Sequence, residues 1–166
     1  MMGKNNKSYN SKNTQGFTLI ELLVVIVILS ALSVAGISTF AASQKKSRDT
    51  RRKSDLAQIA KALEYYANDS GSYPSSSNGN ILACGGTCTW GSAFTSSLGT
   101  VYMQVLPKDP STFSYRYDKV GTGYTLSAYL ESDFDPDRNT NLTTSCGSKN
   151  CTYVLRSSNL TPTPKL

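Results

Sequence analysis

An apolar run that begins with a single carboxylate constrains this 166-residue chain more than any other feature. Glu21 directly precedes a segment that extends from Leu22 to about Ala42 and holds no other charged residue. A helix of roughly 20 residues is about 30 Å long, which is enough to cross the core of a bilayer. Placing an unpaired charge in hydrocarbon costs several kcal/mol. Glu21 therefore needs a partner or a function.

The residues ahead of this run form a short basic leader. Its charged residues are Lys4, Lys7 and Lys12, and it ends at the small residue Gly16. An ordinary secretory signal peptide matches poorly, because an acidic residue lies inside the run and no A-x-A-like cleavage site follows it. A plain single-pass anchor would have the same topology, but it would gain nothing from the carboxylate.

With this leader, the stretch from Gly16 to Leu29 resembles the class III signal of type IV pilins and type II secretion pseudopilins. The resemblance implies that a prepilin peptidase removes residues 1–16 as a leader peptide and methylates the new N-terminus at Phe17. It also implies a hydrophobic transmembrane and assembly helix over residues 17–44, an inner-membrane assembly platform as a partner, and a role for Glu21 in assembly.

Charge pairing gives that role a physical reason. Cleavage creates an α-amine on Phe17, which is costly to bury when the helix leaves the bilayer for a packed helical bundle. The Glu21 carboxylate of a neighbouring subunit would neutralise this amine. Only one axial offset brings the two groups together, so the pair would also set the register. We therefore expect the chain to assemble with copies of itself into a helical homopolymer.

The helix is expected to run from about Thr18 to Asn68, with residues 45–70 as its amphipathic continuation. Apolar residues recur at helical spacing from Leu56 to Ala67, and glycine and proline follow as stop signals. Residues 45–53, the basic cluster, carry six bases and one acid. We interpret the cluster as a solvated helix face. Contacts with lipid headgroups, with acids of neighbouring subunits or with DNA stay open as alternatives.

Residues 71–156 predict a globular head. Strands are expected at 113–117, 124–130 and 152–156, and a short helix is expected near 92–98. Alternate residues of the second strand share one apolar face, which suits packing against the amphipathic half of the helix: Tyr124, Leu126, Ala128 and Leu130. The predicted class is α+β, a pilin fold with a long N-terminal helical stalk packed on a small antiparallel sheet of about three strands. Residues 157–166 are expected to form a mobile tail.

Later motifs extend the resemblance over most of the chain. Asp69-x-Gly-x-Tyr-Pro, Val105-Leu-Pro-Lys-Asp-Pro, Tyr115-Arg-Tyr and Tyr124-x-Leu-x-Ala-x-Leu-Glu follow one another as in the head of the major pseudopilin group. The chain departs from that group in its cysteines, in a longer insertion at 75–100 and in a C-terminal segment of its own. The choice between a secretion system and a surface pilus therefore stays open.

Four cysteines follow the predicted membrane segment: Cys84, Cys88, Cys146 and Cys151. Outside the cytoplasm, an even number of cysteines indicates disulfides. Three pairings exist, and we favour the two local bridges, Cys84–Cys88 and Cys146–Cys151, because each closes a short loop that contains glycine. Zinc binding through C-x3-C and C-x4-C is the rival interpretation.

Asp133, Asp135 and Asp137 place carboxylates at alternate positions of one loop, a spacing similar to the first half of an EF-hand loop. Arg138 stands where that motif has glycine, and Thr144 stands at its twelfth position. The family resemblance implies calcium in this general part of the head, without a residue-by-residue match. Calcium and a solvated acidic loop stay open as alternatives, and no other cofactor is expected.

The sequence does not favour an enzyme. It contains no histidine, the commonest general base, and it shows no nucleophile with a partner base. The expected function is that of a structural subunit of a type IV pilus-like extracellular filament, held in the cell membrane by a single pass before assembly. The alternatives are a type II secretion pseudopilin of a short periplasmic piston, and a minor pilin for adhesion or DNA uptake.

Overall fold

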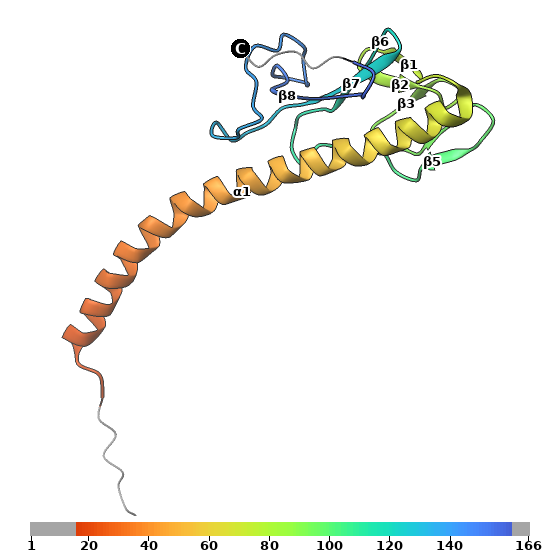
Figure 1. Ribbon diagram of the computed structural model, residues 1–166. Coiled ribbons are helices and arrows are strands. Elements are labelled where there is room, and N and C mark those ends of the chain that lie inside the picture. The colour runs from red at the N-terminus through yellow and green to blue at the C-terminus, as the bar shows by residue number, and fades with distance from the viewer. Residues whose placement is uncertain (1–15, 161–166) are drawn as a thin grey trace, which may run out of the picture. The chain divides into compact units, whose positions relative to one another are not determined.

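The computed structural model describes residues 16–160, and it describes the backbone alone for residues 34–38. These residues belong to two compact units, which divide after Phe40 (Figure 1). The predicted leader, apart from Gly16, and the last six residues of the predicted tail lie outside the described residues.

One long helix, α1 (Leu19–Ser70), contributes to both units. Its bounds lie within two residues of the predicted helix from Thr18 to Asn68. Two serines of its apolar part donate hydroxyl hydrogen bonds to backbone carbonyls four residues earlier, Ser30 to Ile26 at 2.6 Å and Ser33 to Leu29 at 2.7 Å. These hydroxyls are satisfied locally, so they do not interrupt the helix.

The head is built on a three-stranded antiparallel sheet in the order β6–β7–β8 (Figure 1). The strands are β6 (Arg116–Val120), β7 (Gly123–Ala128) and β8 (Tyr153–Arg156). Val120 pairs with Gly123, so a two-residue turn joins β6 to β7. The α+β class and the sheet of three strands are therefore confirmed, although the first strand starts at Arg116 rather than at residue 113.

One hydrophobic core joins the helix to this sheet. The apolar stripe of α1 is buried at Leu56, Ile59 and Leu63. β7 supplies the face that the alternation predicted, with Tyr124, Leu126 and Ala128 buried, and Leu130, which follows the strand, is buried as well. Full burial of a large apolar side chain contributes about 1.5–3 kcal/mol, so this stripe is one of the contacts that hold the second half of α1 on the head.

In the sequence, five short strands follow α1 and precede β6. β1 (Ser75–Ser77), β2 (Asn80–Leu82) and β3 (Thr87–Cys88) form one sheet, and β4 (Phe94–Thr95) pairs with β5 (Val101–Met103). The prediction of a short helix near 92–98 is wrong. Phe94 is buried there, and its ring stacks on Tyr66 of α1 with 5.6 Å between centroids. Burying this ring outweighs the weak helix propensity of a serine-rich segment.

The predicted start of the mobile tail, at residue 157, is also wrong. Ser157 is buried beside β7: its backbone N–H donates to the Tyr124 carbonyl, and its hydroxyl accepts from the Tyr124 N–H, both at 3.1 Å. The ordered head therefore extends past residue 156 to include Ser157.

Candidate functional site

The predicted cleavage bond between Gly16 and Phe17 lies just before α1 begins. Both residues are exposed and outside regular secondary structure, and the Phe17 side chain has 89% of its surface accessible. A Cβ added to Gly16 would meet no atom within 4 Å. A peptidase could therefore reach this bond without first unfolding a helix, although cleavage itself stays a prediction.

Glu21 has a local partner in the single chain. Its carboxylate accepts hydrogen bonds from the Thr18 backbone N–H and from the Thr18 hydroxyl, each at 2.8 Å. The Glu21 N–H in turn donates to the Thr18 hydroxyl oxygen at 3.3 Å. This reciprocal arrangement is a capping box. Our sequence reasoning missed it, although the pattern Thr18-x-x-Glu21 before an apolar run is its usual signal.

The first turns of α1 expose apolar side chains on all sides. From Phe17 to Leu32, each large apolar residue is at least 48% accessible. An apolar surface of this extent marks a site of contact with other proteins or with a membrane. Among the described residues, no helix combines the length and the apolar character needed to cross a membrane. The membrane crossing expected for residues 17–44 stays a prediction.

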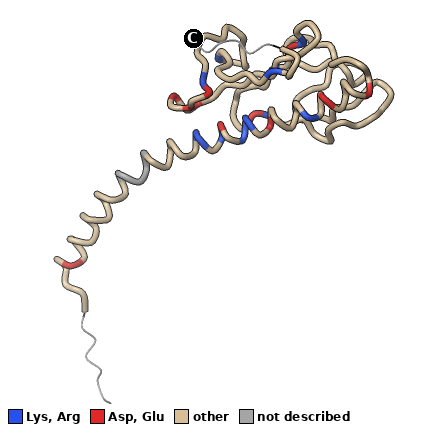
Figure 2. The backbone as a smooth tube through the Cα atoms, viewed as in Figure 1, with Lys and Arg blue, Asp and Glu red and all other residues tan. Residues whose placement is uncertain are grey.

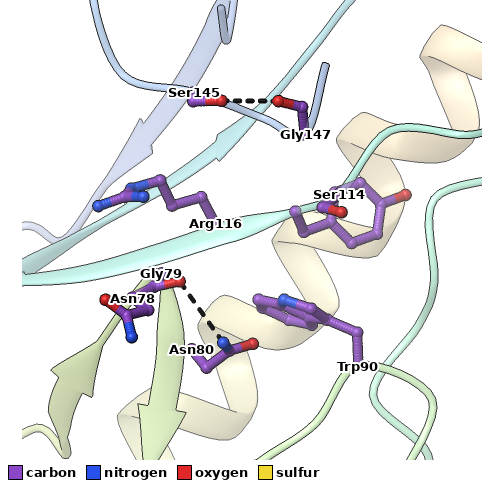
Figure 3. A pocket seen from close by; sticks show the side chains of 9 residues that line it. Asn78, Gly79, Asn80, Trp90, Ser114, Arg116, Ser145 and Gly147 are labelled. Carbon is purple, nitrogen blue, oxygen red and sulfur yellow. Dashed lines mark hydrogen bonds between the residues drawn. The ribbon is translucent and has the colours of Figure 1, made fainter. Parts of the chain in front are cut away.

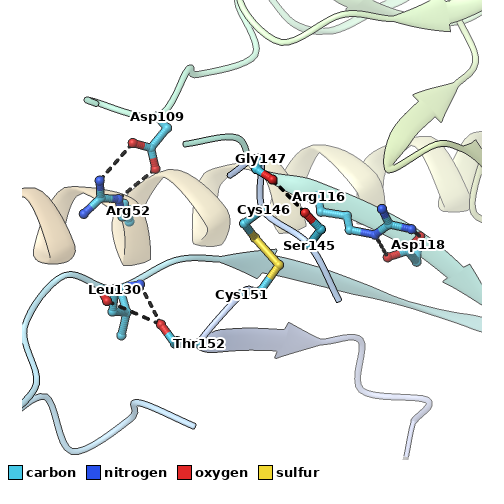
Figure 4. The surroundings of a disulfide bond; sticks show 10 residues. All are labelled: Arg52, Asp109, Arg116, Asp118, Leu130, Ser145, Cys146, Gly147, Cys151 and Thr152. Carbon is cyan, nitrogen blue, oxygen red and sulfur yellow. Dashed lines mark hydrogen bonds and ion pairs between the residues drawn. A yellow bond between two sulfur atoms is a disulfide. The ribbon is translucent and has the colours of Figure 1, made fainter. Parts of the chain in front are cut away.

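The second functional feature is a buried ion cluster between α1 and the head. Arg52 has no accessible surface, yet its guanidinium contacts three carboxylates: Asp49 at 2.7 Å, Asp109 at 2.7 Å and Glu131 at 2.8 Å. Arg48 also pairs with Glu131. These five residues are the buried ion cluster. Figure 4 shows the paired contact between Arg52 and Asp109, and Figure 2 shows charges gathered on the part of α1 that belongs to the head.

Hydrogen bonding keeps this cluster charged. The bond from Arg48, aided by Arg52, lowers the pKa of Glu131 to about 2 against the opposing effect of burial. Burial opposes the charge on Arg52, but the hydrogen bonds to Asp109, Glu131 and Asp49 outweigh it and raise the pKa of the guanidinium. Asp49 also accepts from the backbone N–H groups of Glu131 and Ser132, at 2.9 and 2.8 Å. The cluster thus fixes the chain that leaves β7.

The basic cluster at 45–53 is therefore more than a solvated helix face. Lys45, Lys46 and Arg51 are exposed, as that interpretation requires. Arg48, Arg52 and Lys53 instead turn toward carboxylates of the head. The interpretation was wrong for these three residues, because their partners lie far away in sequence. The last of the three, Lys53, reaches the loop for which calcium was considered.

That loop uses its acids as ion-pair partners. The Lys53 ammonium lies 2.6 Å from Asp135 and 2.9 Å from Asp137, and Arg138 pairs with Asp133 at 2.9 Å. Across the described residues, no group of three or more acidic, histidine or cysteine side chains could hold a metal ion. In this arrangement an ammonium takes the place that a divalent cation would need, so the residues do not fit calcium as they stand. Calcium binding stays an untested prediction.

The cysteines form the two local disulfides, Cys84–Cys88 and Cys146–Cys151. The favoured pairing is confirmed, and no free thiol is left among the four. Their Cα atoms are 5.4 and 5.0 Å apart, within the usual range for a bridge. Figure 4 shows the second bridge beside Ser145 and Gly147.

Comparisons with known proteins agree with these features. The family model of the prokaryotic N-terminal methylation motif matches residues 11–37, and that of type II secretion system protein G matches residues 39–131. The chain therefore belongs to the type II secretion system protein G family, within the wider group of pilins and pseudopilins. The match ends before the loop at 133–137, the second disulfide and β8.

Several curated proteins are similar to this chain. The type II secretion system core protein G of Pseudomonas aeruginosa is 32% identical over 111 residues, which is 67% of this chain and 78% of that protein. The protein of the same name from Pectobacterium carotovorum is 32% identical over 77 residues, or 46% of this chain and 49% of its own length. The type IV wide pilus major component PilA4 of Thermus thermophilus is 41% identical over 64 residues, 39% of this chain and 49% of that pilin. The chain thus spans about half the length of the Pectobacterium carotovorum and Thermus thermophilus proteins. No solved structure matches the chain significantly.

Replacing Arg52 should unfold the head more easily. Arg52→Met removes the cation that three carboxylates share, and breaking a buried ion pair from one side costs about 3–5 kcal/mol. We expect a loss of that size in the free energy of unfolding, measured by denaturant titration. Arg51→Met is the matched control, because Arg51 is 66% exposed and lies 3.9 Å from Asp55. It should cost less than about 1 kcal/mol, and equal effects of the two variants would contradict the importance of burial.

Acid should weaken the same cluster. The pKa of Glu131 is lowered from 4.5 to about 2 in the folded chain, so its ionised form favours folding at neutral pH. This contribution is complete above about pH 4.5 and is lost as the pH falls toward 2. We expect the melting temperature to fall over that interval, and to fall less in Glu131→Gln. A variant that kept the full pH dependence would assign the effect to other carboxylates.

Proposed function

We propose that this chain is the structural subunit of a pilus-like extracellular filament, assembled through its N-terminal helix after removal of the leader. Family membership supports the general role of a pilin-like subunit. The observation that carries the proposal is the apolar surface from Phe17 to Leu32, which nothing in the described chain covers and which directly follows the cleavage motif. An apolar surface of this extent marks a contact site, and we infer that it lies in a membrane or in a bundle of like helices.

The proposal also specifies the partners of the chain and its location before and after assembly. The prepilin peptidase and the inner-membrane assembly platform act on the precursor while its apolar segment is held in the cell membrane. Other copies of the chain then replace lipid around that segment in the filament. Binding of DNA has weaker support, since half of the basic cluster is engaged by the head. We assign the chain no catalytic role.

A secretion pseudopilin is the second candidate, because most of the chain aligns with core protein G of Pseudomonas aeruginosa. The two candidates share the processing and the assembly mechanism. They differ in whether the filament extends outside the cell or stays within the envelope. Labelling of intact cells with an antibody to the head separates them. Long labelled filaments outside the cell support the first candidate, and signal only after the envelope is opened supports the second.

Processing can be tested by mass. The mature protein should begin at Phe17 and carry one additional methyl group on its α-amine, because the motif ends at Gly16. Intact-mass measurement of the membrane-extracted protein would detect both changes. Gly16→Glu should leave the full-length precursor, with no filaments. A mature N-terminus elsewhere, or an uncut wild-type chain in a strain with an active peptidase, would contradict the proposal.

Two substitutions at Glu21 separate its roles. Glu21→Gln keeps a side chain that can complete the capping box but removes the charge, whereas Glu21→Ala removes both. If the carboxylate neutralises the Phe17 amine of a neighbour, each variant leaves one buried charge unpaired, at about 3–5 kcal/mol per subunit. We therefore expect both to insert and to be cleaved normally, and both to lose most of their filament yield, measured by shearing and sedimentation. Normal filaments from Glu21→Gln would show that capping alone matters.

A further inference from the structure

A polar cavity of about 290 Å³ lies on the head, where it has no part in assembly as proposed. Figure 3 shows it between the turn at Asn78, the start of β6 and Trp90. Its lining comes from four separate segments of the chain: Asn78, Gly79 and Asn80; Trp90; Ser114, Tyr115 and Arg116; Ser145 and Gly147.

The β1–β2 turn forms one wall and is held rigidly. Ser77 pairs with Asn80, which leaves Asn78 and Gly79 as a two-residue loop with φ angles of 50° and 79°. Positive φ at both positions defines a type I′ turn, for which Asn-Gly is the preferred sequence. The Gly79 carbonyl accepts from the Tyr117 N–H at 2.9 Å, and a Cβ on Gly79 would come within 2.8 Å of the Arg116 side chain. The glycine therefore lets Arg116 pack against the turn.

The opposite walls of the cavity come from segments next to the two disulfides. Trp90 follows the Cys84–Cys88 bridge by two residues, and its ring meets Tyr115 edge to face at 5.9 Å. Cys146 lies between the lining residues Ser145 and Gly147, and its carbonyl accepts from the Ser114 N–H at 3.2 Å. The first bridge thus lies two residues before Trp90, and the second closes the loop that holds Gly147, so both constrain segments that line the cavity.

The cavity offers uncharged hydrogen-bonding groups beside an aromatic surface. Within the described part of the chain, the Asn78 amide and the Ser114 hydroxyl are exposed and make no hydrogen bond to protein, and neither does the indole N–H of the half-buried Trp90, so all three can bond to a ligand. The one formal charge in the lining is compensated, because Arg116 makes a paired contact with Asp118 through Nε at 2.7 Å and Nη2 at 2.9 Å. An anion would therefore find little net attraction here, and an apolar ligand would leave the polar groups desolvated.

We propose that this cavity binds a neutral saccharide ring. Hydroxyls on a sugar both donate and accept, as the asparagine amides do, and the C–H face of the ring can pack on the Trp90 indole. The volume of about 290 Å³ lies just below the roughly 300–1,000 Å³ usual for ligand pockets, which suits one ring of a glycan. This site would give the filament an affinity for surface glycans that assembly does not require.

The full-length protein in detergent micelles can test this on an array of neutral and acidic glycans. Trp90 is the single tryptophan of the sequence, so its fluorescence reports on the cavity directly. Titration with the neutral saccharides that bind should shift its emission. Asn78→Gly should weaken binding about tenfold or more, because it removes one amide from the site. Glycine accepts the positive φ of this position, so the turn should keep its shape.

Two more variants complete the design. On the glycan array, which does not need tryptophan emission, Trp90→Ala should abolish binding, and Trp90→Phe should retain part of it because a flat ring remains. Asn141→Ala is the matched control, since Asn141 is exposed and lies outside the lining. The proposal is overturned if no saccharide binds, if Asn78→Gly binds as tightly as the wild type, or if only acidic saccharides bind. The last result would indicate an anion site at Arg116. None of these outcomes depends on filament formation.

Discussion

The buried guanidinium of Arg52 is the interaction on which the arrangement of the head depends. Burying an ion costs several kcal/mol, and only close partners with good geometry offset it. Three carboxylates meet that requirement, and two of them come from the segments around Asp109 and Glu131, far along the chain. If either segment moved away while the rest of the head still covered Arg52, the guanidinium would lose part of its compensation in a poorly solvated site. The head is therefore held on α1 by a specific ion cluster as well as by apolar burial.

This cluster explains how one continuous helix can serve two purposes. Around Leu56, Ile59 and Leu63 the helix is covered by the sheet, and at Arg48 and Arg52 it is held by charge. From Phe17 to Leu32 its large apolar side chains are exposed. These side chains are available for contact with lipid or with other subunits. The change from apolar to charged residues along α1 thus separates intramolecular packing from assembly.

The sequence predicted what depends on local periodicity. The stripe at Leu56, Ile59 and Leu63 and the alternation in β7 each identify a buried face from neighbouring residues alone. Short strands such as β4 escaped prediction, because Phe94 is fixed by contacts distant in sequence: its pairing with Met103 of β5 and the stacking of its ring on Tyr66 of the helix. The partners of Arg52 and the walls of the polar cavity also escaped it. They are brought together by tertiary packing between segments with no fixed spacing.

Glu21 illustrates how one carboxylate can act at successive stages. In the single chain its two bonds to Thr18 satisfy a donor at the helix start and keep the carboxylate solvated and ready. If cleavage frees the amine of Phe17, as we propose, a neighbouring Glu21 can exchange those bonds for a charge pair in a dry environment, where such a pair is far stronger. The gain in assembly is therefore a difference between two satisfied states, not the full strength of the pair.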